Sequence, residues 1–413
     1  MNNEKLMGMY IHIPFCIKKC KYCDFLSGSY DASTMTAYVE SLIIELRMHS
    51  HIYGVYGNNY PISTIFIGGG TPSILDSKYI TRILDTIKEY FTIKADAEIS
   101  IETNPGTFSL EKAVGYINAG INRISIGLQT ANEDELRAIG RIHSYKDFIN
   151  SYNYALESGF KNINVDLMSA LPYQTLDSYK KTLNKVLSLS PTHISAYSLI
   201  LEEGTPLYDY INNTDKSILP DEDTEREMYY LTKELLLKYG YNRYEISNYA
   251  KAGYECKHNL SYWSDVSYLG IGVGASSYIK ANMTDELASS CRYQNIADIH
   301  KYIDTLSSIK SDDILTTTKE KVMTTLSNII CDRVELTNKD SIEEYMYLGL
   351  RKVNGISICE FKNKFNIDVF DIYKDVLDKY KTLGLLTITE DTISLTDKGL
   401  DVSNTIFSDF LLD

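Results

Sequence analysis

The sequence has no apolar run long enough to cross a membrane and no excess of positive charge. Its longest weakly polar stretch, residues 268–278, is far short of the about 20 apolar residues that a spanning helix needs. Basic residues number 41 against 55 acidic ones, which gives the 413-residue chain a net charge of −14. Because an acidic surface repels phosphate groups, we expect no transmembrane segment, no nucleic-acid partner and no polybasic lipid anchor.

A secretory signal and a regular set of paired cysteines are also missing. Glu4 interrupts the short apolar stretch at the N-terminus, so we expect a cytoplasmic protein that reaches a membrane only through an acceptor protein. The chain has seven cysteines, an odd number, and three of them lie within residues 16–23. In a reducing compartment such a cluster indicates metal binding or redox chemistry rather than disulfides.

The first half of the chain alternates short β-rich runs with longer segments of helical periodicity. Residues 77–90, for example, place four apolar side chains on one helical stripe. Buried strands joined by helices predict a parallel sheet, and six units are too few for a closed eight-stranded barrel. We therefore expect an α/β fold, a partial (β/α)6 barrel, with strands at residues 9–14, 63–69, 98–103, 123–129, 162–168 and 193–200.

The second half is organised differently. Gly204, Pro206 and the polar run 212–217 predict a boundary after the sixth strand. Towards the C-terminus, helical patterns are followed by a hairpin-like segment at 386–396, which is typical of a winged-helix-like domain. This domain lacks the basic face that DNA binding requires, so we expect it to serve packing. The expected domains are a barrel with the cysteine loop (1–205), an α+β extension (206–310) and a C-terminal winged-helix-like domain (311–413).

The three clustered cysteines carry the strongest chemical signal. Cys16, Cys20 and Cys23 are spaced C-x3-C-x2-C in a loop after the first expected strand. Three thiolates can hold three irons of a [4Fe–4S] cluster and leave the fourth iron open to a small molecule. A zinc site is the alternative, but structural zinc needs four ligands, usually in two pairs. His12 or Cys256 could supply a fourth ligand, although no second paired motif exists.

This spacing, with an aromatic residue before the last cysteine, resembles the signature of the radical S-adenosylmethionine (SAM) superfamily. Residues 10–16 (YIHIPFC) and 20–25 (CKYCDF) more narrowly resemble the oxygen-independent coproporphyrinogen III oxidase-like family. The resemblance implies a [4Fe–4S] cluster and SAM as cofactors, with further matching motifs over essentially the whole chain.

Polar residues near the ends of consecutive strands favour a ligand site at the mouth of the barrel. A buried strand would otherwise select apolar side chains, although any one of these residues could be a structural cap. The resemblance implies that Glu102 binds the ribose of SAM, that Gln129 and Asp166 complete the nucleoside pocket, and that Arg141 lies near the SAM carboxylate. The implied SAM-binding residues are Tyr10, Tyr22, Gly69, Gly70, Thr71, Glu102, Gln129, Arg141 and Asp166.

A second motif begins at His258. A lone histidine is most often structural, and an aromatic-rich turn is the alternative here. Cys256 lies two residues before it, and Trp263, the single tryptophan of the chain, lies five residues after it. An imidazole or thiolate can ligate haem iron, and aromatic rings can pack on a flat macrocycle. The pattern His-Asn-x-x-Tyr-Trp resembles that of HemW-type haem chaperones and implies a haem site made of His258, Asn259, Tyr262, Trp263 and Cys256.

The chain departs from its relatives at a few positions near the expected mouth. Ala170 and Tyr173 stand where relatives usually carry glycine, and Ser276 stands where a histidine is common. None of these changes removes an expected ligand, but they alter the substrate side of the mouth.

Two functions of different classes remain. One is a haem chaperone that binds a cluster with exchangeable SAM and delivers haem to acceptor proteins such as respiratory enzymes. The other is an oxygen-independent coproporphyrinogen III oxidase, or another radical SAM enzyme acting on a tetrapyrrole, which needs an electron donor for the cluster. The oxidases carry a long N-terminal extension and a Cys-x-Cys where this chain has Cys23, Asp24 and Phe25. Both differences favour the carrier.

Overall fold

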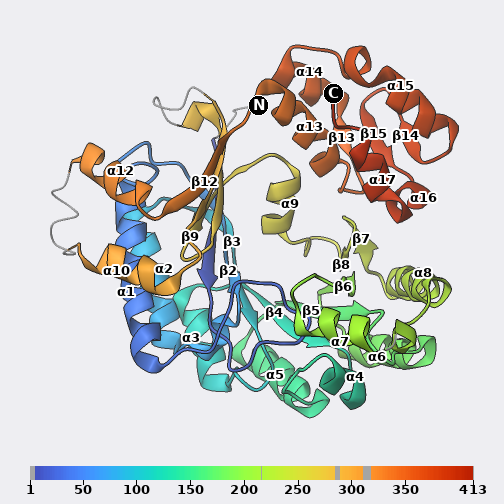
Figure 1. Ribbon diagram of the computed structural model, residues 1–413, viewed down its shortest axis with the longest axis horizontal. Coiled ribbons are helices and arrows are strands. Elements are labelled where there is room, and N and C mark those ends of the chain that lie inside the picture. Colours follow the sequence, from blue (N-terminus) through green and yellow to red (C-terminus); the bar gives the residue numbers. More distant parts are fainter. Residues whose placement is uncertain (1–4, 215, 284–288, 310–317, 413) are drawn as a thin grey trace.

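The computed structural model describes residues 5–214, 216–283, 289–309 and 318–412 (Figure 1). A single twelve-stranded sheet runs through the larger part of the molecule, in the order β12-β11-β10-β9-β1-β2-β3-β4-β5-β6-β8-β7. Its middle consists of six parallel strands in chain order: β1 (Met7–Ile13), β2 (Ile62–Gly69), β3 (Ile93–Thr103), β4 (Arg123–Gln129), β5 (Asn162–Ser169) and β6 (His193–Ser198).

All six expected strands are present, and β3 is longer than expected. The strand begins at Ile93. The sequence pattern indicated only its buried run, because Ala95 and Asp96, which precede that run, are exposed. Every carboxyl end of the six parallel strands lies at the same edge of the sheet, so the loops that follow them meet there.

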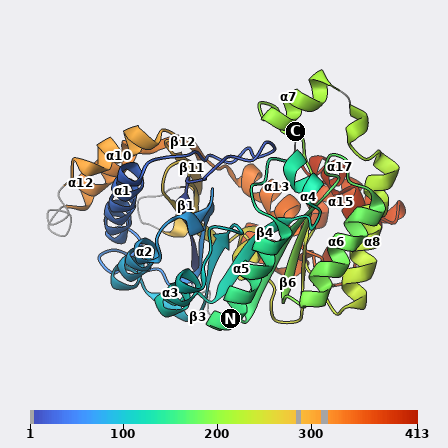
Figure 2. The same ribbon diagram turned by 90° about the horizontal axis from the view of Figure 1, so that it is seen from below.

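Helices that join these strands pack side by side along one face of the sheet (Figure 2). In α2 the buried stripe contains Ile80, Ile83, Leu84 and Ile87, as the periodicity predicts, and Asp76 caps its first turn. The helices of this part are α1 (Ala32–Ser50), α2 (Ser77–Tyr90), α3 (Leu110–Ala119), α4 (Glu133–Ala138), α5 (Tyr145–Ser158) and α6 (Leu176–Leu189).

The region after β6 extends both edges of the same sheet. One edge receives β7 (Asn242–Arg243) and β8 (Asn248–Ala250). The other receives β9 (Ser267–Ile271), β10 (Ser276–Ile279), β11 (Cys291–Asn295) and β12 (Ile330–Glu335), with β9 parallel to β1. Its helices are α7 (Pro206–Asn213), α8 (Glu222–Lys238), α9 (Lys257–Trp263), α10 (Ile299–Ser307) and α12 (Lys319–Ser327).

Two main hydrophobic cores divide the described residues. The larger joins the six-stranded unit to the region after it, from Met7 to Ile329. The C-terminal core centres on Met346, Phe361 and Leu377. The predicted boundary after residue 205 stays a prediction, and the one at 310/311 lies outside the described residues.

The C-terminal part is a separate layer of helices around a small sheet (Figure 1). Three short strands pair antiparallel in the order β13-β15-β14, and residues 386–396 form the expected hairpin. Its elements are α13 (Asn338–Gly349), β13 (Ile356–Ser357), α14 (Ile358–Phe365), α15 (Val369–Thr382), β14 (Leu386–Ile388), β15 (Thr392–Leu395), α16 (Asp397–Asp401) and α17 (Ser403–Ser408). The expected α/β class with a C-terminal domain is confirmed. None of the helices in the described part of the chain is both long and apolar enough to cross a membrane.

Candidate functional site

The loop that follows β1 presents the three clustered cysteines. Its two ends are pinned together, since Cys16 N donates to Gly28 O at 2.8 Å and Gly28 N donates to Pro14 O at 2.8 Å. All three cysteines are free thiols and are partly exposed. The closed base fixes where the loop starts and ends, next to the carboxyl end of β1. No three His, Cys, Asp or Glu side chains in the described ranges group closely enough to hold a single metal ion.

Residues that follow β2 and α4 approach two of these sulfur atoms. Thr71 Oγ1 lies 3.7 Å from Cys16 Sγ, and Arg141 Nη1 lies 3.7 Å from Cys20 Sγ. Gly70 has no room for a side chain, because a Cβ there would come within 2.7 Å of Phe15 O and 3.1 Å of Cys16 Sγ. The glycine is therefore required by the close approach of the β2 loop to the cysteine loop.

Arg141 joins the cysteine loop to the ends of β3 and β4. Its Nη2 donates to Asn104 Oδ1 at 2.8 Å and also to the carbonyl oxygen of Gly127. Asn104 Nδ2 in turn donates to Thr71 Oγ1 at 2.7 Å. A small pocket beside Cys20 is lined by Thr71, Asn104 and Arg141 among others. Asn104 was not among the predicted site residues, although its place two residues after Glu102 at a strand end was a usable signal.

Two carboxylates lie near the ends of β3 and β5. Glu102 is half-buried and accepts a hydrogen bond from Gly69 N at 3.0 Å. Burial, with the charge of Asp166 as a smaller cause, raises the pKa of Glu102 to about 7. Asp166 accepts from Ser125 Oγ at 2.9 Å and from Asn164 Nδ2 at 2.8 Å, and burial raises its pKa as well. Neighbouring carboxylates whose charged forms are destabilised are typical of a ligand site.

The other residues predicted for this site lie along the same edge. Gln129 ends β4 with a left-handed backbone, φ 71°, and is buried. Tyr10 on β1 bonds His12 Nδ1 at 3.0 Å, and burial, with the nearby charge of Glu102 as a smaller cause, raises the pKa of Tyr10. Burial raises the pKa of Tyr22. Ala170 and Tyr173 both have positive φ, 57° and 64°, a backbone conformation that favours glycine.

A second, larger cavity of about 540 Å³ opens next to the cysteine loop. Its walls come from that loop, from the end of α9, from the β9–β11 region and from α13. Six of the fifteen lining residues are tyrosine, phenylalanine or tryptophan, and the charged ones are Asp24, Asp265 and Arg292. The lining residues are Tyr10, His12, Asp24, Phe25, Leu26, Tyr262, Trp263, Asp265, Tyr268, Gly274, Ser276, Tyr278, Arg292, Gln294 and Leu348.

Helix α9, which carries the His-Asn-x-x-Tyr-Trp motif, is held at its start by a buried carboxylate. Glu98 on β3 accepts from Lys257 N at 3.0 Å and from His258 N at 3.2 Å. Cys256 Sγ donates to the same carboxylate at 3.4 Å. An anion at a helix N-terminus satisfies the free N–H groups there. Glu98 was missed from the sequence, since nothing local links it to a helix 160 residues later.

The structure separates the motif residues into buried and cavity-lining groups. His258 is buried, with Nδ1 2.8 Å from Thr64 Oγ1 and Nε2 2.9 Å from Tyr262 OH. Tyr262 and Trp263 line the cavity, whereas Asn259 is partly exposed. Cys256 is fully buried. Tyr262 thus bonds the imidazole on one side and lines the cavity on the other.

Burial sets the protonation states of the two candidate ligands. It lowers the pKa of His258 to about 3, so the ring is neutral at physiological pH. It raises the pKa of Cys256 to about 12, so this residue stays a thiol. Because metals bind neutral imidazole and thiolate, the protonation state of His258 suits metal binding better than that of Cys256.

Two family models match the chain: the radical SAM superfamily over residues 10–186 and the HemN C-terminal domain over residues 336–402. Curated relatives named heme chaperone HemW match over nearly the full length. The one from Lactococcus lactis is 35% identical over 99% of this chain and 98% of its own, and the one from Bacillus subtilis is 36% identical over 98% and 99%. The chain belongs to the HemW family.

The HemW family assignment agrees with the fold. Coproporphyrinogen III oxidase (HemN) from Escherichia coli, a radical SAM enzyme, has a TM-score of 0.80 to this structure and is 24% identical over 99% of this chain and 90% of its own. That likeness establishes a shared architecture. HemW from Escherichia coli is 39% identical, over 65% of this chain and 69% of its own.

Proposed function

We propose that this member of the HemW family is a haem carrier that holds a [4Fe–4S] cluster, binds SAM exchangeably and passes haem to acceptor proteins. The aromatic cavity beside the cysteine loop is the observation that supports this function best. Its volume of about 540 Å³ lies within the range of about 300–1,000 Å³ that is usual for ligand sites. Flat rings such as Tyr262, Trp263 and Tyr268 suit a flat macrocycle.

The cysteine loop fits a [4Fe–4S] cluster held by Cys16, Cys20 and Cys23. Three free thiols on one pinned loop meet the need for three ligands, and the hydroxyl of Thr71 and the guanidinium of Arg141 lie near two of the sulfur atoms. Donors of this kind tune a cluster through its sulfurs. When bound, the cluster supplies single electrons, and an external electron donor is required if SAM is cleaved.

At the carboxyl edge of the sheet, different residues suit different chemical groups of SAM. Glu102 and Asp166 offer acceptors to ribose hydroxyls, and Gln129 and Tyr22 complete that side of the pocket. Gly69, Gly70 and Thr71 offer close backbone approach to the methionyl end. The planar fork of Arg141 suits the SAM carboxylate. Tyr10 lies beside Glu102 and in the wall of the large cavity, so it connects the SAM site to the haem site.

His258 is the proposed axial ligand of haem iron, with Cys256 in reserve. The neutral imidazole is suitable, and its Nε2 is bonded to Tyr262, which lines the cavity. Rotation of Tyr262 away from His258 would free Nε2 for iron. Asn259 and Trp263 would flank the macrocycle on the same helix.

The second candidate function is a coproporphyrinogen III oxidase, which the shared architecture with HemN favours. At 24% identity that likeness carries the fold alone, whereas the named relatives of higher identity are haem chaperones. We infer that the protein works in the cytoplasm and meets any membrane through its acceptor.

Haem titration of the anaerobically reconstituted protein tests the carrier. We expect saturation at about one haem per chain. Trp263→Ala should weaken binding by about three- to tenfold, since it removes one aromatic contact, and His258→Ala should alter the haem absorption spectrum. Phe370→Ala, an exposed aromatic on α15, serves as the matched control and should change neither. Haem binding that does not saturate and is unchanged by all three substitutions would contradict the proposed site.

A further inference from the structure

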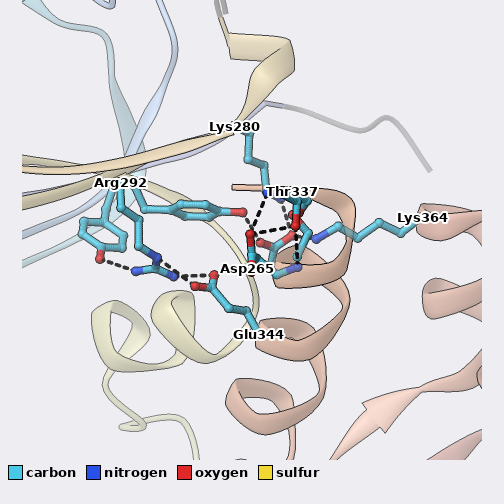
Figure 3. Close-up of polar contacts among 10 residues, drawn as sticks. Asp265, Lys280, Arg292, Thr337, Glu344 and Lys364 are labelled. Atoms are coloured by element: carbon cyan, nitrogen blue, oxygen red, sulfur yellow. Dashed lines mark hydrogen bonds and ion pairs between the residues drawn. The ribbon is translucent and has the colours of Figure 1, made fainter. Parts of the chain in front are cut away.

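Two charged residues that line the large cavity, Asp265 and Arg292, belong to a cluster of ion pairs beside it. We name Lys280, Arg292 and Lys364 the cationic rim. Both lysines pair with Asp265, Lys280 at 2.8 Å, while Arg292 pairs with Glu344 (Figure 3). Asp24 also lines the cavity, so what matters for a ligand is where the cations lie and not a net charge. Of the three rim cations, Arg292 lines the cavity wall itself, so a ligand anion in the cavity would meet its guanidinium first.

Arg292 is oriented toward the cavity by residues of the sheet. Its Nη1 donates to Tyr268 OH at 3.1 Å, and its guanidinium lies 4.7 Å from the ring centre of Tyr278. Tyr268, Tyr278 and Arg292 all line the cavity. These contacts come from β9 and β10, so they hold the guanidinium in place whether or not Glu344 on α13 is bonded to it.

The ion pair between Arg292 and Glu344 shows that the guanidinium is placed to bind a carboxylate. Arg292 Nε donates to Glu344 Oε1 at 3.0 Å and Nη2 donates to Oε2 at 2.7 Å. This two-pronged geometry is the one that any carboxylate adopts on arginine. The Arg292 side chain keeps a third of its surface exposed, 33%. A ligand carboxylate can thus approach it and exchange with Glu344.

An aromatic cavity with a cationic rim at one end matches a ligand with a flat apolar body and acidic groups along one edge. Resting on the proposed function, we propose that Arg292, supported by Lys280 and Lys364, binds the propionate carboxylates of the macrocycle in exchange for Glu344. Asp265 and Glu344 then act as internal substitutes that keep the cations ordered when the cavity is empty. Arg292 is the residue that selects macrocycles with free acid groups.

Binding of haem is compared with binding of haem dimethyl ester, which lacks free carboxylates. The wild-type protein should prefer free haem by about tenfold or more, the value of a hydrogen-bonded charge pair. Arg292→Gln should lose most of this preference. Glu344→Gln should raise the affinity for free haem, because it removes the competing carboxylate, whereas a purely structural pair would lower it. Arg82→Gln, which breaks the exposed two-pronged pair with Glu40, is the matched control and should change nothing.

The outcomes separate this inference from the proposed function. If the wild type binds neither macrocycle, the carrier function itself fails. If it binds haem and the ester equally, or if Arg292→Gln keeps the preference, the propionate assignment is overturned while the carrier function stands. If Arg292→Gln folds poorly, Glu344→Gln gives an independent test. Weaker binding of free haem by the Glu344→Gln variant would contradict the exchange of Glu344 for a propionate.

Discussion

At the residue scale, the chemistry of the site depends on a few side chains whose neighbours set their charge. Cys16, Cys20 and Cys23 stood out from spacing alone, because all three fall within eight consecutive residues. The network around them could not be predicted, since Arg141, Asn104 and Thr71 meet only after three strands are aligned. Contacts between residues so far apart in sequence can be identified only once the fold is known.

The first residue-scale prediction concerns the cluster. Cys20→Ala should lower the iron and sulfide content and the visible absorption of anaerobically reconstituted protein, because two thiolates hold a [4Fe–4S] cluster poorly. Cys359→Ala, at an exposed free cysteine on α14, is the control and should leave all three unchanged. Full iron and sulfide in the Cys20 variant would rule out this ligand set.

The second concerns Glu102, whose folded-state pKa of about 7 exceeds the ordinary value of 4.5. The folded protein binds this proton more tightly than the unfolded chain, so Glu102 costs stability as pH rises from 4.5 through 7. Without SAM, Glu102→Gln should match the wild type at pH 4.5 and exceed it at pH 8 by about 1–3 kcal/mol in unfolding free energy. Denaturant unfolding at the two pH values measures this. An equal difference at both would show that the carboxylate is not destabilised.

At the element scale, most helices and strands follow from local patterns, and the exceptions have long-range causes. The apolar stripe of α2 was predicted from its helical period, and the six parallel strands were predicted from short, nearly continuous apolar runs. Helix α9 has seven residues, and its start is stabilised by Glu98 from a distant strand. No periodicity in residues 257–263 could reveal that support.

Helix ends offer a prediction at this scale. Helices α3 and α5 end on glycines in the left-handed region, whereas α6 ends on Ser190 with φ 54°. A non-glycine residue there costs about 1 kcal/mol. Ser190→Gly should therefore raise the unfolding free energy by about 0.5 kcal/mol, once the greater freedom of glycine in the unfolded chain is counted.

The reverse change at α5 is the matched comparison. Gly159→Ser should lower the unfolding free energy by about 1 kcal/mol, because its φ is 102° and a Cβ there meets nothing within 4 Å, so backbone strain is the whole effect. Denaturant titration of both variants checks the pair. Changes of the same sign in both would contradict the assignment of these helix ends.

At the scale of the whole molecule, the large cavity is assembled from parts far apart in sequence. The cysteine loop contributes Phe25, α9 contributes Trp263, β11 contributes Arg292 and α13 contributes Leu348. The sequence predicted the motif on α9 and the fold class. The aromatic walls form only when the cysteine loop, α9 and the added strands of the sheet come together, and the C-terminal unit adds Leu348 to them. Tyr268 and Tyr278 were not predicted, because strand pairing is what brings them to Arg292.

The central claim is that the molecule carries haem rather than decarboxylating a porphyrinogen. The most direct measurement is an anaerobic incubation of the cluster-loaded protein with SAM, a reductant and coproporphyrinogen III, with a parallel sample loaded with haem, followed by product analysis of both. We expect no decarboxylated porphyrinogen in the first sample and intact, releasable haem in the second. Catalytic formation of protoporphyrinogen IX would contradict it.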